Sequence, residues 1–295
     1  MTGVSLAPST TRFASRRLGR RPSVAWLIGA LCVGAIAIMA APIVLSFLAS
    51  VKTAADASAA PPRYLPGILS YENYAKVFKY QAGLATYVGN SAYVALITIV
   101  ASLAIAAPAG YGLARFQMRG KEIAFLILLA PIMIPYQALL TPLYLDFAKI
   151  GLVNTHFGLA VIHTILQLPF SIFLMRSSFE AVPREIEEAA IMDGCSSWRR
   201  LVHIFLPLTV PGLVTLALFA LINSWNEFLA ALIFMNNETS FTVPILIVNV
   251  RTEKLGAVDW GALQASVIIS IVPCLAVYLL LQRYYISGLL SGAVK

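Results

Sequence analysis

Six long apolar runs constrain this chain more than any other feature of its sequence. They cover residues 24–51, 88–113, 123–147, 157–180, 209–235 and 262–282. A transmembrane helix needs about 20 mainly apolar residues, and every run meets that requirement. We therefore predict an all-α, polytopic membrane protein with six transmembrane helices. Each run contains Pro, Gly or small residues, which membrane helices tolerate.

The composition excludes a soluble domain. Only 12% of the 295 residues are charged and 59% are hydrophobic, which leaves too little polar surface for a soluble protein. The first run is about twice as long as the apolar core of a cleaved signal peptide, so we expect it to remain as a membrane helix. Basic cytoplasmic loops explain the net charge of +8, and we expect no nucleic acid as a partner.

Basic residues indicate how the six helices are oriented. When the helices alternate, four basic segments fall on one side of the membrane: 1–23, 114–122, 180–208 and 283–295. The positive-inside rule makes that side cytoplasmic. Both termini, the tails 1–23 and 283–295, are then predicted to be cytoplasmic. Three loops are predicted to lie outside: 52–87, 148–156 and 236–261.

The loop 180–208 is a charged segment between two apolar runs. Pro183 suits the first turn of a helix, and three glutamates follow near the positive end of that helix. Gly194 offers a stop, and Ser196 or Ser197 can cap a second helix. The sequence predicts a helix–glycine–helix elbow. Such an elbow either lies on the bilayer as an amphipathic segment or docks rigidly into a soluble partner.

This loop resembles the signature loop of bacterial ABC importer permeases. The signature is Glu-Ala-Ala, three residues, Gly, nine residues and Ile-x-Leu-Pro, carried here by Glu188, Ala189, Ala190, Gly194, Ile204, Leu206 and Pro207. The form Ala190-Ile191-Met192-Asp193-Gly194 resembles the carbohydrate branch, the maltose/trehalose/glycerol-phosphate type. The stretches 223–228 and 288–295 are similar to that branch as well.

The resemblance implies a type I ABC importer permease fold in the bacterial cytoplasmic membrane. It implies a permease subunit for a carbohydrate, paired with a second, different permease and a dimer of cytoplasmic ATPase subunits. A periplasmic or lipid-anchored sugar-binding protein would meet the outer loop 236–261. The residues that would couple this chain to the ATPase are Glu187, Glu188, Ala189, Ala190, Met192, Asp193, Gly194, Leu206 and Pro207.

The chain itself is not expected to be an enzyme. The P-loop pattern is absent, because Gly120-Lys121 is followed by Glu122. ATP and Mg²⁺ are therefore expected on the partner ATPase, and no cofactor on this chain. No nucleophile–base pair or paired carboxylate favours catalysis, and the three histidines and three cysteines show no metal-ligand spacing.

Polar residues inside the fourth and fifth runs are candidates for the path of the solute. The run 209–235 contains Asn223, Asn226 and Glu227, which we expect on one face of a continuous helix, beside Trp225. The run 157–180 contains a stripe that includes His163 and Gln167. Polar groups at this depth usually face the bundle interior or a wet cavity. These side chains either contact the sugar or join helices by hydrogen bonds.

Two alternative functions remain open at this stage. One is an ABC permease for phosphate, amino acids or peptides, which the Ala-x-Met-Asp-Gly form of the loop disfavours by resemblance alone. The other is an ion-coupled secondary carrier that works without an ATPase. Such a carrier needs ionisable relays in several helices, and the predicted spans offer little beyond Glu227 and His163.

Overall fold

The structure of the protein is a computed structural model that describes residues 22–251 and 258–293. The predicted basic tail 1–23 lies almost wholly outside the described residues, as do the last two residues of the predicted tail 283–295. The chain divides into two compact units, residues 1–45 and 46–295. Every element in the described part is a helix, which confirms the all-α prediction.

The elements have the following bounds: α1 (Pro22–Ser50), α2 (Ala54–Ala57), α3 (Glu72–Phe78), α4 (Leu84–Arg115), α5 (Lys121–Leu129), η1 (Ala130–Met133), α6 (Tyr136–Lys149), α7 (His156–Glu180), α8 (Arg184–Met192), α9 (Ser197–Arg200), η2 (Leu201–Phe205), α10 (Leu206–Leu208), α11 (Val210–Asn226), α12 (Leu229–Phe234), η3 (Glu238–Ser240), α13 (Val243–Arg251) and α14 (Trp260–Ala293). The predicted tail 283–295 is therefore helical over most of its length, as a continuation of α14.

Within residues 22–251 and 258–293, four single helices are long and apolar enough to cross a membrane: Trp26–Ser50, Leu84–Arg115, His156–Glu180 and Trp260–Gln282. Two bent pairs of helices bring the number to six when each pair is one span. In the first unit, α1 carries no charged residue, and large apolar side chains such as Trp26 and Met39 are exposed. Such a surface requires lipid or another protein chain around it.

The third predicted span, 123–147, is not a straight helix. It is a pair, Lys121–Met133 and Tyr136–Lys149, that bends by 98°. Pro131 lies at the start of η1 and Pro135 directly precedes α6. Proline lacks a backbone N–H and restricts the residue before it, so these two prolines end one helix and begin the next. These two prolines mark the bend in the third span.

The fifth predicted span, 209–235, is wrong as a single helix. Its first part, α11, is bent by 79° relative to the preceding segment Ser197–Leu208. α11 then ends at Asn226. Glu227 then has an extended backbone, with φ −70° and ψ 121°, before the short helix α12 begins. The six predicted spans thus correspond, in the described part of the chain, to four single helices and two broken spans.

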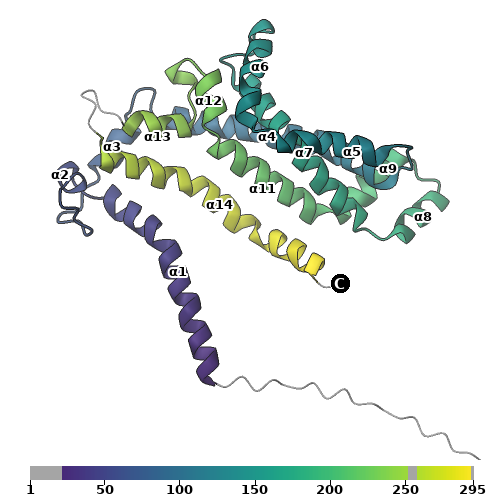
Figure 1. Ribbon diagram of the computed structural model, residues 1–295, viewed down its shortest axis with the longest axis horizontal. Helices are drawn as coiled ribbons and strands as arrows, with labels where there is room; N and C mark the ends of the chain where they lie inside the picture. Colours follow the sequence, from purple (N-terminus) through teal and green to yellow (C-terminus); the bar gives the residue numbers. More distant parts are fainter. Residues whose placement is uncertain (1–21, 252–257, 294–295) are drawn as a thin grey trace, which may run out of the picture. The chain divides into compact units, whose positions relative to one another are not determined.

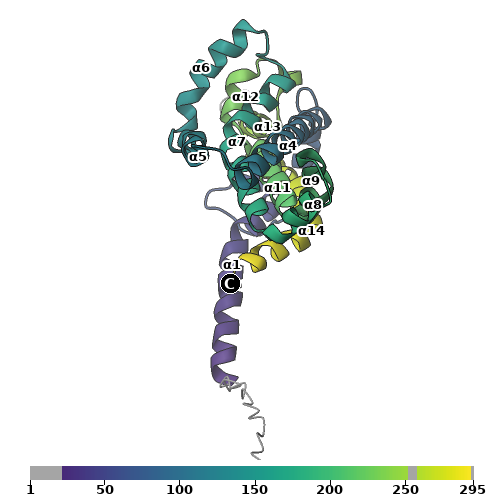
Figure 2. The ribbon, with the colours of Figure 1, turned by 90° about the vertical axis from the view of Figure 1, so that its right-hand side faces the viewer.

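The second unit is built around α4, α7 and α11, which pack against one another (Figure 1). α14 packs along α11 and α13, and α5 and α6 lie to one side of this group (Figure 2). Within this unit, α8 and α9 lie at one end and α3 and α13 at the other. The loop 180–208 and the described part of the loop 236–261 are therefore at opposite ends of the unit, as alternating spans require.

The closest approach between α4 and α7 depends on a glycine. A Cβ added at Gly110 would lie 2.7 Å from the Met175 Cβ and 2.8 Å from the Arg176 backbone nitrogen. Neither of these atoms lies at the end of a flexible side chain. Small residues that let two backbones approach are the usual way in which membrane helices pack. Gly110 therefore sets the spacing of the central helix pair.

We predict that Gly110→Ala lowers the free energy of unfolding by about 1–3 kcal/mol, the usual cost of overpacking. Gly112→Ala on the same helix is the matched control, because its Cβ would meet no atom within 4 Å. That control gains helix propensity and is expected to be neutral or stabilising. Thermal unfolding of both detergent-purified variants measures the difference, and equal transition temperatures would contradict the assigned role of Gly110.

Candidate functional site

The first limb of the elbow is α8, and it ends in the manner predicted. Gly194 adopts φ +74°, and its N–H donates to Ile191 O at 2.9 Å. The N–H of Cys195 donates to Ala190 O at 3.0 Å. These two hydrogen bonds form a Schellman motif, in which glycine takes the left-handed position without a steric penalty. The predicted glycine stop is confirmed.

The second limb begins at Ser196, whose side chain accepts a hydrogen bond from the Arg199 N–H at 3.4 Å. Ser196 rather than Ser197 is thus the cap of α9. A wider helical turn follows from Leu201 to Phe205, and both of these side chains are buried. They pack in one cluster with Tyr111. The limb is therefore anchored to the membrane helices by its apolar face.

The coupling residues named from the sequence divide into two groups by exposure. Ala190 is buried, and Glu187 and Leu206 are partly buried. The remaining ones are exposed: Glu188, Ala189, Met192, Asp193, Gly194 and Pro207. Near the glycine turn, three large apolar side chains also face outward, with Met192 86%, Trp198 69% and Ile191 50% exposed. The elbow therefore presents an apolar tip that the fold itself leaves uncovered.

The sequence reasoning did not identify Arg115, the last residue of α4, which contacts both limbs. Its guanidinium donates to the backbone oxygens of Phe179 and Val182. It also lies 3.5 Å from the Glu187 carboxylate and over the Phe205 ring, 4.8 Å from the centroid. Only 4% of the Arg115 side chain is exposed. In the sequence, Arg115 is one of several basic residues in the segment 114–122, which is predicted to be cytoplasmic, and no motif marks it as a functional residue.

The polar residues of α7 and α11 join the two helices. His163 Nδ1 lies 2.9 Å from Ser224 Oγ, and Asn223 Nδ2 donates to Gln167 Oε1 at 3.5 Å. His163, Gln167 and Ser224 are buried. Of the two roles considered for this stripe, hydrogen bonding between helices is the one these contacts show directly.

Glu227 does not share a helical face with Asn223 and Asn226, because α11 ends before it. Its carboxylate accepts hydrogen bonds from the N–H groups of Ala230 at 2.9 Å and Ala231 at 3.1 Å. It therefore caps α12. A continuous helix would have bonded those N–H groups to its own carbonyls, so the cap stabilises the break. The Glu227 carboxylate also lies 3.4 Å from His163 Nε2.

The break nevertheless brings several predicted residues to one cavity of about 360 Å³. Its lining residues are Tyr136, Ile222, Asn223, Asn226, Glu227, Phe228 and Leu229. Trp225 lies elsewhere: it is buried, and its indole N–H donates to the Ser270 carbonyl of α14 at 3.1 Å. The cavity thus offers two amides, a carboxylate and a phenol from α6, α11 and the break between α11 and α12.

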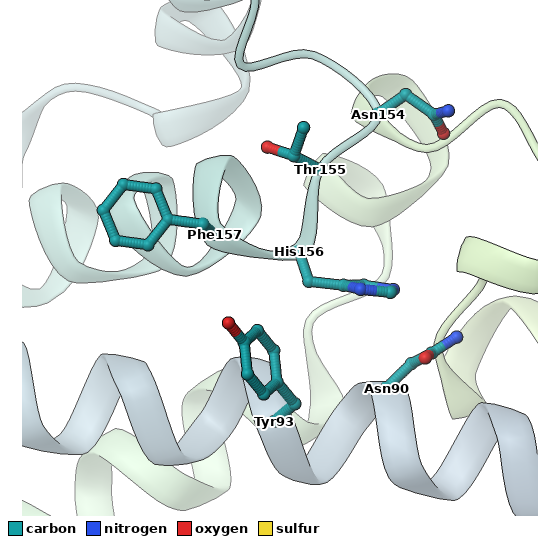
Figure 3. Close-up of a pocket in the computed structure, with 6 residues that line it drawn as sticks. All are labelled: Asn90, Tyr93, Asn154, Thr155, His156 and Phe157. Carbon is teal, nitrogen blue, oxygen red and sulfur yellow. The ribbon is translucent and has the colours of Figure 1, made fainter.

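A second cavity, of about 560 Å³, lies near the start of α4 and α7 (Figure 3). Tyr93 of α4 meets the His156 ring edge to face, with centroids 6.0 Å apart. Asn90 donates to the carbonyls of Thr239 and Phe241 at 2.8 and 2.9 Å. These contacts attach the loop 236–261 to α4, so the described part of that loop has a defined support.

The fold and these sites define a polytopic helical membrane protein with a polar cavity and a protruding elbow. Residues 106–289 match the family model described as the binding-protein-dependent transport system inner membrane component. The chain belongs to this family, and it is a non-catalytic, multi-pass inner-membrane component of an ABC transporter.

Individual comparisons agree with this assignment. The chain is 38% identical over 231 residues to the probable ABC transporter permease protein YurM of Bacillus subtilis, covering 78% of this chain and 76% of that protein. It is 34% identical to the arabinooligosaccharides transport system permease protein AraQ of Halalkalibacterium halodurans, covering 78% and 81%.

A crystal structure of a bacterial ABC transporter involved in the import of the acidic polysaccharide alginate has the same fold. Its matching chain superposes with a TM-score of 0.76 at 24% identity, covering 90% of this chain and 98% of that one. The predicted ABC importer permease fold is confirmed.

We predict that Glu227→Ala destabilises α12 by about 0.5–2 kcal/mol, the cost of losing a helix cap. Asn226→Ala is the matched control, because Asn226 donates only to Ile222 O within α11. Hydrogen–deuterium exchange should become faster in residues 229–234 of the Glu227 variant alone. Unchanged exchange in that segment would rule out the capping role.

Proposed function

We propose that this chain is the permease subunit of an ATP-driven importer that carries a carbohydrate across the cytoplasmic membrane. Membership of the binding-protein-dependent family provides the transport class. The similarity to the arabinooligosaccharides permease AraQ and the form of residues 190–194 support a sugar as the cargo. The observation that carries the coupling part of the proposal is the rigid elbow with an uncovered apolar tip.

The ATPase would dock on the exposed side of the elbow. Glu188, Met192, Asp193 and Gly194 lie there, beside the exposed apolar side chains of Ile191 and Trp198. Glu187 supports the elbow from within, because it faces Arg115 and Arg200. ATP and Mg²⁺ would be bound by the ATPase dimer. This arrangement places the loop 180–208 and both termini in the cytoplasm, in agreement with the distribution of basic residues.

The sugar would pass the cavity between α6 and α11. Asn223, Asn226 and Tyr136 present amide and phenol groups that suit sugar hydroxyls, and Asn226 is exposed. Gln167 and His163 support this wall from behind through Asn223 and Ser224. Trp225 has a packing role against α14 in this proposal, since its indole N–H is already bonded.

Two further partners complete the proposed transporter. A second, different permease would cover the apolar surfaces that this chain leaves exposed. A periplasmic or lipid-anchored sugar-binding protein would deliver the sugar at the outer end. The loop 236–261 would receive that binding protein, since Asn90 and His156 hold its η3 turn against the membrane helices.

We predict that Gly194→Val abolishes uptake. The residue has φ +74° and no atom within 4 Å of an added Cβ, so the effect is backbone strain of about 1–2 kcal/mol or more. That strain opens the turn and moves one limb of the elbow relative to the other. Uptake by membrane vesicles and copurification of the ATPase measure the outcome.

Gly120→Val is the matched control for this variant. Gly120 has φ +78° and equally open space, and it lies in the loop before α5 rather than in the elbow. The control should keep near-normal uptake. Full uptake by the Gly194 variant, or equal loss in both variants, would contradict the coupling role of the elbow.

The cargo is tested with vesicles that contain the complete transporter. We expect uptake of at least one labelled sugar from a panel of maltose, trehalose and arabino-oligosaccharides, and none of phosphate or amino acids. Uptake should need ATP and should persist when an ionophore dissipates the proton gradient. Uptake that follows the gradient instead would favour the ion-coupled carrier.

We predict that Asn226→Leu raises the sugar concentration for half-maximal uptake. Loss of one hydrogen bond costs about 0.5–1.5 kcal/mol, which corresponds to about two- to tenfold. Asn226→Gln keeps the amide and is expected to lie close to the unmodified protein. An unchanged half-saturation in the leucine variant would remove Asn226 from the sugar path.

A further inference from the structure

Arg115 connects the elbow to the membrane helices through a contact that is both charged and buried. Arg115 ends α4, and its side chain is 4% exposed. Nη2 donates to the carbonyls of Phe179, in the last turn of α7, and Val182, in the turn before α8, the latter at 2.5 Å. Nη1 lies 3.5 Å from Glu187 Oε2 in α8. One guanidinium thus contacts α7, the following turn and the first limb.

The second limb is connected to the same carboxylate. Arg200 of α9 places its Nε 3.9 Å from Glu187 Oε1, and its Nη1 donates to Cys195 O at 2.9 Å. Phe205, buried after the wide turn, lies under the Arg115 guanidinium. Glu187 therefore sits between an arginine of α4 and an arginine of the second limb, and it joins the two limbs to each other.

A guanidinium suits this position for a physical reason. It presents several donors in one plane and stacks on an aromatic ring, whereas a lysine ammonium is a point charge that does neither. Moving α8 relative to the end of α4 would leave a buried charge without its partners, which costs more than moving the elements together. The contacts therefore favour motion of the elbow, the end of α4 and the end of α7 as one body.

We propose that Arg115, through Glu187, is the positioning residue that transmits displacement of the elbow to α4 and α7. This inference rests on the proposed coupling function of the loop 180–208. It adds that displacement of the elbow is transmitted mainly through the end of α4, at a residue far in sequence from the loop. α4 packs along α7 and α11, so its displacement reaches the wall of the polar cavity.

The test uses the complete transporter, purified through a tag on this chain and reconstituted with its ATPase and binding protein. The probes are Mg-ATP and the panel sugar that the unmodified complex imports. In Arg115→Lys, we expect sugar transported per ATP hydrolysed to fall by about fivefold or more, the lower range of a coupling interaction. Glu187→Gln should lower the same ratio, and the double variant should be no worse than Arg115→Lys.

Arg176→Lys is the matched control. Arg176 pairs with Glu122 and Glu180 at 2.8 Å and lies over the Phe125 ring, 4.2 Å from its centroid. It thus resembles Arg115 in chemistry and in lying near the end of its helix, but among the described residues none of these contacts reaches α8 or α9. The control should keep the unmodified ratio of sugar to ATP.

A spin-label distance gives a readout that mere loss of stability would not move. Cysteines replace the exposed residues Glu185 of α8 and Met118, and Cys32, Cys195 and Cys274 become serine. The distance between the labels should be the same with and without Mg-ATP and vanadate in the otherwise unmodified complex. In the Arg115→Lys background, the nucleotide should shift or broaden that distance.

The outcomes separate this inference from the proposed function. If the unmodified complex contains no ATPase and imports no panel sugar, the proposed function fails. If that complex is coupled but Arg115→Lys and Glu187→Gln keep its ratio of sugar to ATP, the inference alone is overturned. An equal loss in Arg176→Lys also overturns it. If the transporter does not assemble with Arg115→Lys, the inference is tested by the sugar-to-ATP ratio and the label distance of the Glu187→Gln variant.

Discussion

The position of the elbow depends on one buried interaction, the contact of the Arg115 guanidinium with Glu187 and two backbone carbonyls. Without it, α8 would lose its ion pair with the end of α4. A buried arginine is stable only with its partners in place. The geometry of the loop 180–208 therefore depends on α4 and α7 as well as on the loop itself.

The polar cavity depends on a second constraint, that backbone groups inside a membrane must be hydrogen-bonded within the protein. The break between α11 and α12 exposes N–H groups, and the Glu227 carboxylate bonds two of them. This allows an irregular segment at membrane depth, where it lines the cavity. The Glu227 carboxylate, a candidate sugar contact in the sequence, is thus already hydrogen-bonded to the backbone. Asn226 remains exposed beside it.

Some features were predictable because they depend on local chemistry. Apolar length identified the spans, Pro131 and Pro135 located the bend in the third span, and Gly194 located the turn of the elbow. Other features were not predictable. The run 209–235 is long and mainly apolar, so it reads as one helix, and the end of α11 at Asn226 became visible only with the capping bonds of Glu227. Trp225 resembled a cavity residue until its bond to α14 showed otherwise.

The sequence by itself determined that the chain is a membrane protein with about six spans, that the loop 180–208 is a charged segment between two apolar runs, and which permease family it resembles. These properties follow from residue type and spacing, which act over a few helical turns. The tertiary structure alone decided that Arg115 supports the elbow, that Glu187 faces inward, and that α4 and α7 meet at Gly110. The contacts of Arg115 and Gly110 join residues that are 64 to 72 positions apart, and no local periodicity encodes which distant side chains will meet when helices pack.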